Sequence, residues 1–393
     1  MTQALTPLTE EQREVQATAR AFAAKELAPN VAAWDRDAYF EPSLVRKLGE
    51  HGFLGMMVPE EFDGLGLDTL TYLIALEEIA TADASTAVLM SVHNSLPTQM
   101  LLRWGSDEQK QRLLRPMARG DLLGAFALSE SESGSDAASL RTQAVRDGDY
   151  WVLNGTKAWV SSGSVAGAIL TLARTDTPSD RRGARGISAF IVTPDSPGFS
   201  VGKKEDKMGL RASPTVQIRL DNCRVPHANL LGDSGMGFIY AMQSLDAGRL
   251  GIAAQAVGIA QAALRHASHY AAQRRQFGKP IKEFQAVQFQ LADMATRVAA
   301  SRSLLHAAAT ARDRGQQITQ FSAMAKLMAS ETAMWVTTQA IQLFGGYGYV
   351  KDYPVERLFR DAKVTEIYEG TSEIQRIVIA RALYSHDGST HER

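Results

Sequence analysis

Glu369 occupies the position in this sequence that is best suited to proton transfer. It lies in the stretch Tyr368–Arg376, where Gly370 interrupts a regular segment and Thr371-Ser372-Glu373 has the composition of a helix N-terminus. A carboxylate in a turn just ahead of a helix can point into a cleft, with backbone N–H groups beside it. That arrangement would suit a base that removes a proton next to a carbonyl while the N–H groups hold the developing oxyanion. A solvated surface glutamate is the alternative that this short motif leaves open.

Two further stretches could bind a planar or electronegative ligand. The segment Phe126–Asp136 is a strand end that runs into a Ser/Gly loop rich in backbone N–H groups and hydroxyls. The segment Leu153–Ser162 has an Asn-Gly turn followed by Trp159 on a predicted strand, which could form a flat wall against a planar ring. Taken alone, the first could be a polar surface turn and the second could carry a core tryptophan.

Arginine and glycine mark two more candidate ligand-binding loops. Arg274–Pro280 follows a predicted helix end, where an arginine can form paired hydrogen bonds to phosphate. Gln342–Gly348 contains the pair Gly345-Gly346, which allows a ligand to approach the backbone closely. The sequence has no Gly-x-Gly-x-x-Gly after a strand, no Walker loop and no His-Glu-x-x-His, and its histidines lack metal-ligand spacing. We therefore expect no metal site.

The elements that must position these residues fall into three groups. Helix-forming composition predicts helices in the first part of the chain, over residues 10–25, 70–82 and 107–117. Short β-branched and aromatic runs then predict strands at 122–128, 142–145, 150–153, 158–161, 168–173, 187–192, 199–201 and 215–220. Asp147-Gly148 predicts a hairpin, and Asn154-Gly155 predicts the next turn.

Helical periodicity returns after Gly237, with apolar residues three and four apart from Phe284 to Leu305. We expect long helices over residues 246–270, 284–314, 321–344 and 371–384, packed as a four-helix bundle, and a fraying tail from Ser385. The predicted fold is therefore α+β. It has an N-terminal helical domain (1–120), a middle antiparallel β domain (121–236) and a C-terminal helical bundle domain (237–393).

Composition excludes several classes of protein. The 393 residues are 45% apolar and 22% charged, with a net charge of −1, so nothing suggests a nucleic-acid partner. Cys223 is the one cysteine, which excludes an intramolecular disulfide and a thiolate metal cluster. No apolar run approaches the roughly 18 residues that span a bilayer. The N-terminal segment carries four glutamates, unlike a secretory signal or a transit peptide, so we expect a cytoplasmic protein.

The segment Ile367–Arg376 resembles the catalytic signature of the acyl-CoA dehydrogenases, and the resemblance extends along nearly the whole chain. It implies that Glu369 is the base that takes the α-proton of an acyl thioester. Three departures stand out. Ser131 replaces a usual proline, Ser133 replaces a common asparagine or alanine, and Ser161 replaces a more common threonine. Gly248 occupies the position where a minority of members carry the catalytic glutamate. The base is therefore expected from Glu369 alone.

The resemblance also implies an FAD cofactor and the residues that bind it. The implied cofactor-binding residues are Phe126, Leu128, Ser129, Gly134, Ser135, Trp159, Val160, Ser161, Arg274, Phe277, Gln285, Gln342, Gly345, Gly346, Thr371, Ser372 and Glu373. The implied substrate-binding residues are Ser135, Asp246, Arg249, Tyr368 and Gly370. Arg274, Phe277 and Gln285 match a family loop that reaches the flavin of a neighbouring subunit.

The function that the resemblance implies is FAD-dependent dehydrogenation of a short-chain acyl-CoA to a trans-2-enoyl-CoA. Electrons would pass to an electron-transfer flavoprotein, and the enzyme would be a homotetramer. A short branched substrate, such as isobutyryl-CoA or 2-methylbutyryl-CoA, is an alternative. An acyl-CoA oxidase is disfavoured because those enzymes are much longer, and a non-catalytic flavin or acyl-CoA binding protein is disfavoured by Glu369. Residues 91–98 are the candidate floor of the acyl pocket.

Overall fold

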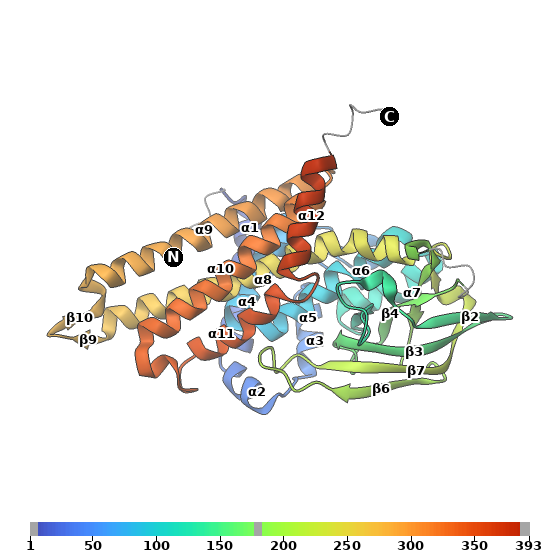
Figure 1. Ribbon diagram of the computed structural model, residues 1–393, viewed down its shortest axis with the longest axis horizontal. Helices are drawn as coiled ribbons and strands as arrows, with labels where there is room; N and C mark the ends of the chain where they lie inside the picture. Colours follow the sequence, from blue (N-terminus) through green and yellow to red (C-terminus); the bar gives the residue numbers. More distant parts are fainter. Residues whose placement is uncertain (1–6, 177–182, 386–393) are drawn as a thin grey trace.

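The computed structural model describes residues 7–176 and 183–385. Helices precede and follow a single large sheet in the chain. Three long helices extend away from that sheet, namely α8 (Gly237–Gln273), α9 (Gln285–Asp313) and α10 (Thr319–Phe344) (Figure 1). The predicted tail lies outside the described residues, apart from Ser385 at the end of the last helix.

The first set of helices is dominated by two almost completely buried segments, α4 and α5. The helices are α1 (Glu10–Phe22), α2 (Val31–Asp37), α3 (Ser43–Glu50), α4 (Thr69–Ala82), α5 (Ala84–Ser95), α6 (Pro97–Trp104) and α7 (Asp107–Arg119), with a π-helical turn at Ala23–Leu27. Capping boxes start α1 and α7, where Thr9 pairs with Gln12 and Ser106 pairs with Gln109. The three helices predicted here are present, whereas α2, α3 and α6 were too short to recognise from periodicity.

The sheet has the strand order β6-β7-β3-β2-β4-β5-β8, and β1 pairs with β4 off that path. Its strands are β1 (Gly124–Ala127), β2 (Gln143–Asp147), β3 (Tyr150–Ser161), β4 (Ala168–Arg174), β5 (Ile187–Val192), β6 (Phe199–Lys204), β7 (Thr215–Pro226) and β8 (Leu230–Leu231). The β2–β3 hairpin is confirmed. The predicted antiparallel pairing is confirmed for most strand pairs. It is wrong for β4, which runs parallel to β1 and to β2, so the sheet is mixed.

The turn predicted at Asn154-Gly155 is also wrong. β3 continues through these residues, and the irregularity is a β-bulge in its pairing with β7. Gly155 is required there for a different reason, since a Cβ atom would collide with the Thr142 side chain on the neighbouring segment.

The second set of helices is built around α8, which is buried along most of its length. The helices are α8 (Gly237–Gln273), α9 (Gln285–Asp313), α10 (Thr319–Phe344), α11 (Val355–Lys363) and α12 (Ser372–Ser385). α8 starts at Gly237, earlier than the predicted Asp246, and packs against α4, α5, α9 and α10. Leu73 and Leu76 of α4 therefore share one apolar core with Ala253 and Val257 of α8.

A short hairpin, β9 (Arg275–Gln276) and β10 (Lys279–Pro280), joins α8 to α9. It lies at the end of the long helices that is farthest from the sheet (Figure 1). The chain therefore presents two separate places for ligand-binding loops, one beside the sheet and one at the far end of the bundle.

Candidate active site

Glu369 lies in a turn directly ahead of α12, as the sequence predicted. The turn is held in an uncommon conformation, with φ of 52° at Glu369 and 92° at Gly370. A positive φ at a residue other than glycine is sparsely populated and persists only where the surroundings enforce it. The Thr371 hydroxyl accepts a hydrogen bond from the Ile374 N–H (3.3 Å), so Thr371 caps the helix that begins behind the turn.

The Glu369 carboxylate is buried and accepts no hydrogen bond from the described residues. Both of its oxygens are inaccessible to solvent, and neither has a hydrogen-bond partner among the described residues. It points at Gly248 on α8, where an added Cβ atom would overlap Oε2. Burial raises the pKa of Glu369 to about 7, against the opposing effect of the Lys326 and Arg249 charges. A carboxylate that is half ionised near neutral pH is suited to act as a general base.

Two cations face this carboxylate from different helices. Arg249 on α8 forms an ion pair with Asp246 (2.6 Å), and Asp246 also accepts a hydrogen bond from the Thr319 hydroxyl (2.7 Å). Lys326 on α10 donates from Nζ to the Gly370 carbonyl oxygen (2.7 Å). Asp246 and Arg249, both predicted to bind substrate, are thus brought to the same place as Glu369.

The rest of the turn is fixed by buried amide groups. Gln375 Nε2 donates to the carbonyl oxygens of Glu369 (3.2 Å) and Gly370 (2.8 Å). The Tyr368 hydroxyl donates to Gln255 Oε1 on α8. Several buried polar atoms nearby have no partner among the described residues, namely Arg249 Nε, Ser372 Oγ and Gln375 Oε1. Unpaired buried polar atoms are rare in proteins, and here they mark a place where a polar ligand would complete the hydrogen bonding.

The first group of predicted flavin residues gathers beside the sheet. The loop after β1 is joined to β3 by a hydrogen bond from the Ala158 N–H to the Ser129 carbonyl (2.9 Å). Next to this contact, the Trp159 side chain is 62% exposed and its backbone φ is 60°. Leu128 and Val160 are buried, Phe126, Ser129 and Ser161 are half-buried, and Gly134 and Ser135 are exposed. The positive φ of Trp159 keeps its indole exposed, and an exposed indole can stack against a planar ring.

A buried ion pair organises this loop, and no pattern in the sequence predicted it. Glu130 accepts hydrogen bonds from Lys157 Nζ (2.7 Å), the Thr142 hydroxyl (2.5 Å) and the N–H groups of Arg141 (2.7 Å) and Thr142 (2.9 Å). Lys157 also donates to the Leu128 carbonyl (3.0 Å). Burial lowers the pKa of Lys157 to about 8, against the opposing charge of Glu130. The pair therefore fixes the start of the predicted flavin loop, at Leu128 and Glu130.

The second group of predicted flavin residues lies at the far end of the bundle. Arg274, Gly345 and Gly346 line a pocket of about 500 Å³ together with Tyr270 and Tyr347. The Arg274 guanidinium lies over the Tyr347 ring, 5.5 Å from its centroid. Phe277 at the tip of the hairpin is 92% exposed with φ of 51°, and Gln285 and Gln342 are also exposed. Figure 1 shows the β9–β10 hairpin at the end of the long helices that is far from β3, the strand that contains Trp159.

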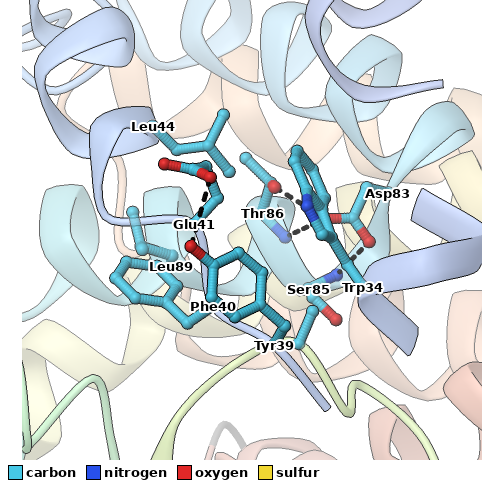
Figure 2. A pocket seen from close by; sticks show the side chains of 10 residues that line it. Trp34, Tyr39, Phe40, Glu41, Leu44, Asp83, Ser85, Thr86 and Leu89 are labelled. Atoms are coloured by element: carbon cyan, nitrogen blue, oxygen red, sulfur yellow. Dashed lines mark hydrogen bonds between the residues drawn. The ribbon is translucent and has the colours of Figure 1, made fainter. Parts of the chain in front are cut away.

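One further pocket lies away from all the predicted residues (Figure 2). Trp34, Tyr39, Phe40 and Leu89 are among the residues that line it, and its volume is only about 10 Å³, enough for about one water molecule. Asp83 in its wall is already used as a helix cap, accepting from the Ser85 and Thr86 N–H groups. The pocket is too small for an acyl chain or a nucleotide.

Comparison with known proteins agrees with the geometry. Three family descriptions match consecutive parts of the chain: "Acyl-CoA dehydrogenase, N-terminal domain" over residues 9–121, "middle domain" over 125–223 and "C-terminal domain" over 235–384. The mouse short-chain specific acyl-CoA dehydrogenase, a mitochondrial protein, is 52% identical over 95% of this chain and 90% of its own length. The chain belongs to the acyl-CoA dehydrogenase family.

Solved structures share the fold along nearly the whole chain. The butyryl-CoA dehydrogenase of Megasphaera elsdenii matches with a TM-score of 0.94 and 42% identity, over 96% of this chain and 99% of that chain. A chain in a structure described as the electron transferring flavoprotein of Acidaminococcus fermentans matches with a TM-score of 0.94 and 46% identity, over 96% and 98% of the two chains. Within the described residues, no helix is long and apolar enough to cross a membrane.

Glu130, Lys157 and Lys326 were missed as site residues of this family member. A signal existed for Lys326, because it lies on the small and apolar stripe Ser322, Ala329, Ala333 of α10 at helical spacing. A lysine at such a position either means that this face of the helix is not buried, or is a buried charge that has a partner. No comparable local signal marks Glu130, which lies in a polar loop.

Proposed function

We propose that this protein catalyses the FAD-dependent α,β-dehydrogenation of a short-chain acyl-CoA to the trans-2-enoyl-CoA and passes the electrons to an electron-transfer flavoprotein. The observation that carries the proposal is the Glu369 carboxylate, which is buried, unpaired and poised near neutral pKa in a strained turn. The relatives named for short-chain and butyryl-CoA substrates support the choice of substrate.

In the proposed reaction, one Glu369 oxygen removes the α-proton of the thioester and becomes a neutral carboxylic acid. The Glu369 backbone N–H donates to the thioester carbonyl and stabilises the negative charge that develops on its oxygen. A bound flavin supplies the two-electron oxidant that accepts the hydride from the β-carbon. Burial at Gly248 keeps water away from the carboxylate, so its basicity is available to the substrate alone.

The residues of this chain fit a flavin dinucleotide that is shared between subunits. We propose that Leu128, Ser129, Trp159 and Ser161 hold the ring end beside the sheet, with the helix start Thr371–Glu373 close to it. A neighbouring subunit would supply Arg274 and the glycine pair Gly345-Gly346 to the diphosphate and adenine, with Phe277, Gln285 and Gln342 at the rim. The separation of the two groups within one chain and the exposure of Phe277 support this arrangement.

The same arrangement makes a homotetramer the proposed working form. Flavin retention should then depend on assembly, because no single chain holds the whole cofactor. Light scattering combined with flavin absorbance would test this point. A monomer that retains its full complement of flavin would contradict the shared site.

The experiment that tests the function is anaerobic reduction of the purified yellow protein by a series of acyl-CoA thioesters. We expect butyryl-CoA to bleach the flavin and kcat/KM to fall from butyryl- through hexanoyl- to octanoyl-CoA. One methylene in an apolar pocket is worth about 1–3 kcal/mol, so a rigid pocket floor must reject the longer chains. A maximum at isobutyryl- or 2-methylbutyryl-CoA would indicate a branched substrate, and no bleaching by any thioester would overturn the proposed function.

A further inference from the structure

Lys326 is a fully buried lysine on α10, surrounded by small residues of the helix packing. Within the described residues, no carboxylate oxygen lies within 4.0 Å of its Nζ, unlike the other fully buried lysine, Lys157. Burying an ammonium group without a close counter-ion costs several kcal/mol, so such a residue is retained only where it makes a compensating interaction.

The polar contact of Lys326 is with the turn that carries the proposed base. Its Nζ donates to the Gly370 carbonyl oxygen at 2.7 Å, and Gln375 Nε2 donates to the same oxygen at 2.8 Å. These two donors come from α10 and α12. Together they fix the peptide that follows Glu369 in its positive-φ conformation, and that peptide determines where the carboxylate points.

Ionisable groups on α4, α8 and α10 and in the turn itself surround Glu369. Arg249 on α8 is neutralised by its ion pair with Asp246, and the Tyr72 hydroxyl from α4 and the Tyr368 hydroxyl are uncharged at neutral pH. Burial lowers the pKa of Lys326 to about 8, while the Glu369 charge raises it and the Arg249 charge lowers it further. Glu366 and Glu373 act on Lys326 more weakly. Lys326 is therefore the cation with the largest effect on the pKa of Glu369, and unlike Arg249 it has no carboxylate oxygen within 4.0 Å among the described residues.

We propose that Lys326 is a positioning residue that anchors the turn through Gly370 and keeps Glu369 ionised. The assignment rests on the proposed function of Glu369 as base. Lys326 does not touch the reacting atoms. It acts on the base through the field of its ammonium group and through the peptide bond next to Glu369.

Lys326→Met and Lys326→Arg test the proposal in the flavin-loaded enzyme, with Lys363→Met as control. Lys363 is a half-exposed lysine paired with Glu366, and its loss should leave the pH profile unchanged. In the plot of kcat/KM for butyryl-CoA against pH, we expect the fall at low pH to occur about one pH unit higher in Lys326→Met than in wild type. The loss of kcat/KM relative to wild type should then be about tenfold greater at pH 6 than at pH 9. Lys326→Arg should restore most of the wild-type limb. A loss equal at every pH, unrelieved by arginine, would overturn the proposal and leave Lys326 with a structural role.

A second measurement needs no turnover. The melting temperatures of flavin-loaded wild type, Glu369→Gln, Lys326→Met and the double variant are compared from pH 5 to pH 9. Because Lys326 favours the ionised carboxylate, the stabilisation gained from Glu369→Gln should be larger in the Lys326→Met background, and the excess should grow with pH. Equal gains in both backgrounds would contradict the coupling. This result stands even if no acyl-CoA reduces the flavin, so failure of the proposed function and failure of this inference are distinguishable.

Discussion

Two buried glutamates in this molecule have buried lysines as neighbours, yet their pKa values are shifted from the ordinary value in opposite directions. Glu130 beside the sheet accepts hydrogen bonds from Lys157, Thr142 and the Arg141 N–H, whereas both Glu369 oxygens lack a partner among the described residues. Burial alone would raise the pKa of Glu130, but the Lys157 charge and these hydrogen bonds bring it below its ordinary value. Burial instead dominates at Glu369 and raises its pKa to about 7.

The difference shows that a lysine in direct contact, together with several hydrogen-bond donors, lowers the pKa of Glu130, whereas cations that make no hydrogen bond to Glu369 do not offset its burial. A carboxylate that accepts several hydrogen bonds is held ionised and is a poor base. A carboxylate that is buried beside cations but left without donors retains its basicity for a substrate. The molecule therefore uses the same two residue types, Glu and Lys, to fix a loop in one place and to support chemistry in the other.

The largest effect should come from removing the unpaired carboxylate. Glu369→Gln should reduce the rate of flavin reduction by butyryl-CoA by about 10²- to 10⁴-fold, because the amide cannot accept the α-proton. Flavin content and acyl-CoA binding should persist. Stopped-flow absorbance under anaerobic conditions would measure the rate. Glu331→Gln, which removes an exposed carboxylate paired with Arg376, is the matched control and should react at the wild-type rate. Near-normal bleaching of Glu369→Gln would remove this residue from the mechanism.

Removing the paired carboxylate should instead affect stability. Glu130→Ala leaves the Lys157 ammonium buried without its counter-ion, which should lower the free energy of unfolding by about 3–5 kcal/mol and weaken flavin retention. Chemical denaturation would measure the change. Glu132→Ala nearby removes an exposed ion pair with Arg141 and should cost about 1 kcal/mol or less. Equal losses in the two variants would mean that the buried pair has no special role.

The smallest effect is the pH dependence that the raised pKa of Glu369 imposes. The folded protein holds this proton up to about pH 7, whereas the unfolded chain releases it near pH 4.5. Stability from this group is therefore fully present below pH 4.5 and is lost as pH rises through 7, by up to about 1.4 kcal/mol per pH unit. Glu369→Gln should lack this loss, so its melting temperature should exceed that of wild type increasingly from pH 5 to 7. A difference that does not vary with pH would contradict the raised pKa.

Local signals predicted the parts of the fold that are decided locally. Helical periodicity placed α9 and α10 to within a few residues, and Asp147-Gly148 placed the β2–β3 hairpin. The turn at Glu369 followed from Gly370 and the capping residues behind it. The parallel pairing of β1 with β4 was not predictable, because the order of strands in a sheet depends on segments far apart in the chain. The turn predicted at Asn154-Gly155 failed for the same reason. Gly155 is needed there because Thr142, from another segment of the chain, packs closely against it.

Sequence motifs supplied candidate residues for the site, but not the residues that support them. Motif resemblance supplied Glu369, Trp159 and Arg274 as candidates, and their roles remain proposals. The residues that hold the loops, Glu130, Lys157 and Lys326, make long-range contacts with backbone carbonyls or N–H groups. Every residue has a backbone carbonyl group, so the type of a residue does not indicate whether it accepts such a hydrogen bond.

Gly248 and Glu369 occupy opposite sides of one small volume, and only one of them can fill it. In members of the family that carry their glutamate at the position of Gly248, the same volume would be reached from a rigid helix rather than from a strained turn. Relocating the base from the turn to α8 therefore requires two coordinated exchanges. A glutamate added at 248 alone would collide with the existing carboxylate, and a glycine introduced at 369 alone would remove the proposed base. An evolutionary path between the two arrangements must pass through an inactive or a crowded intermediate.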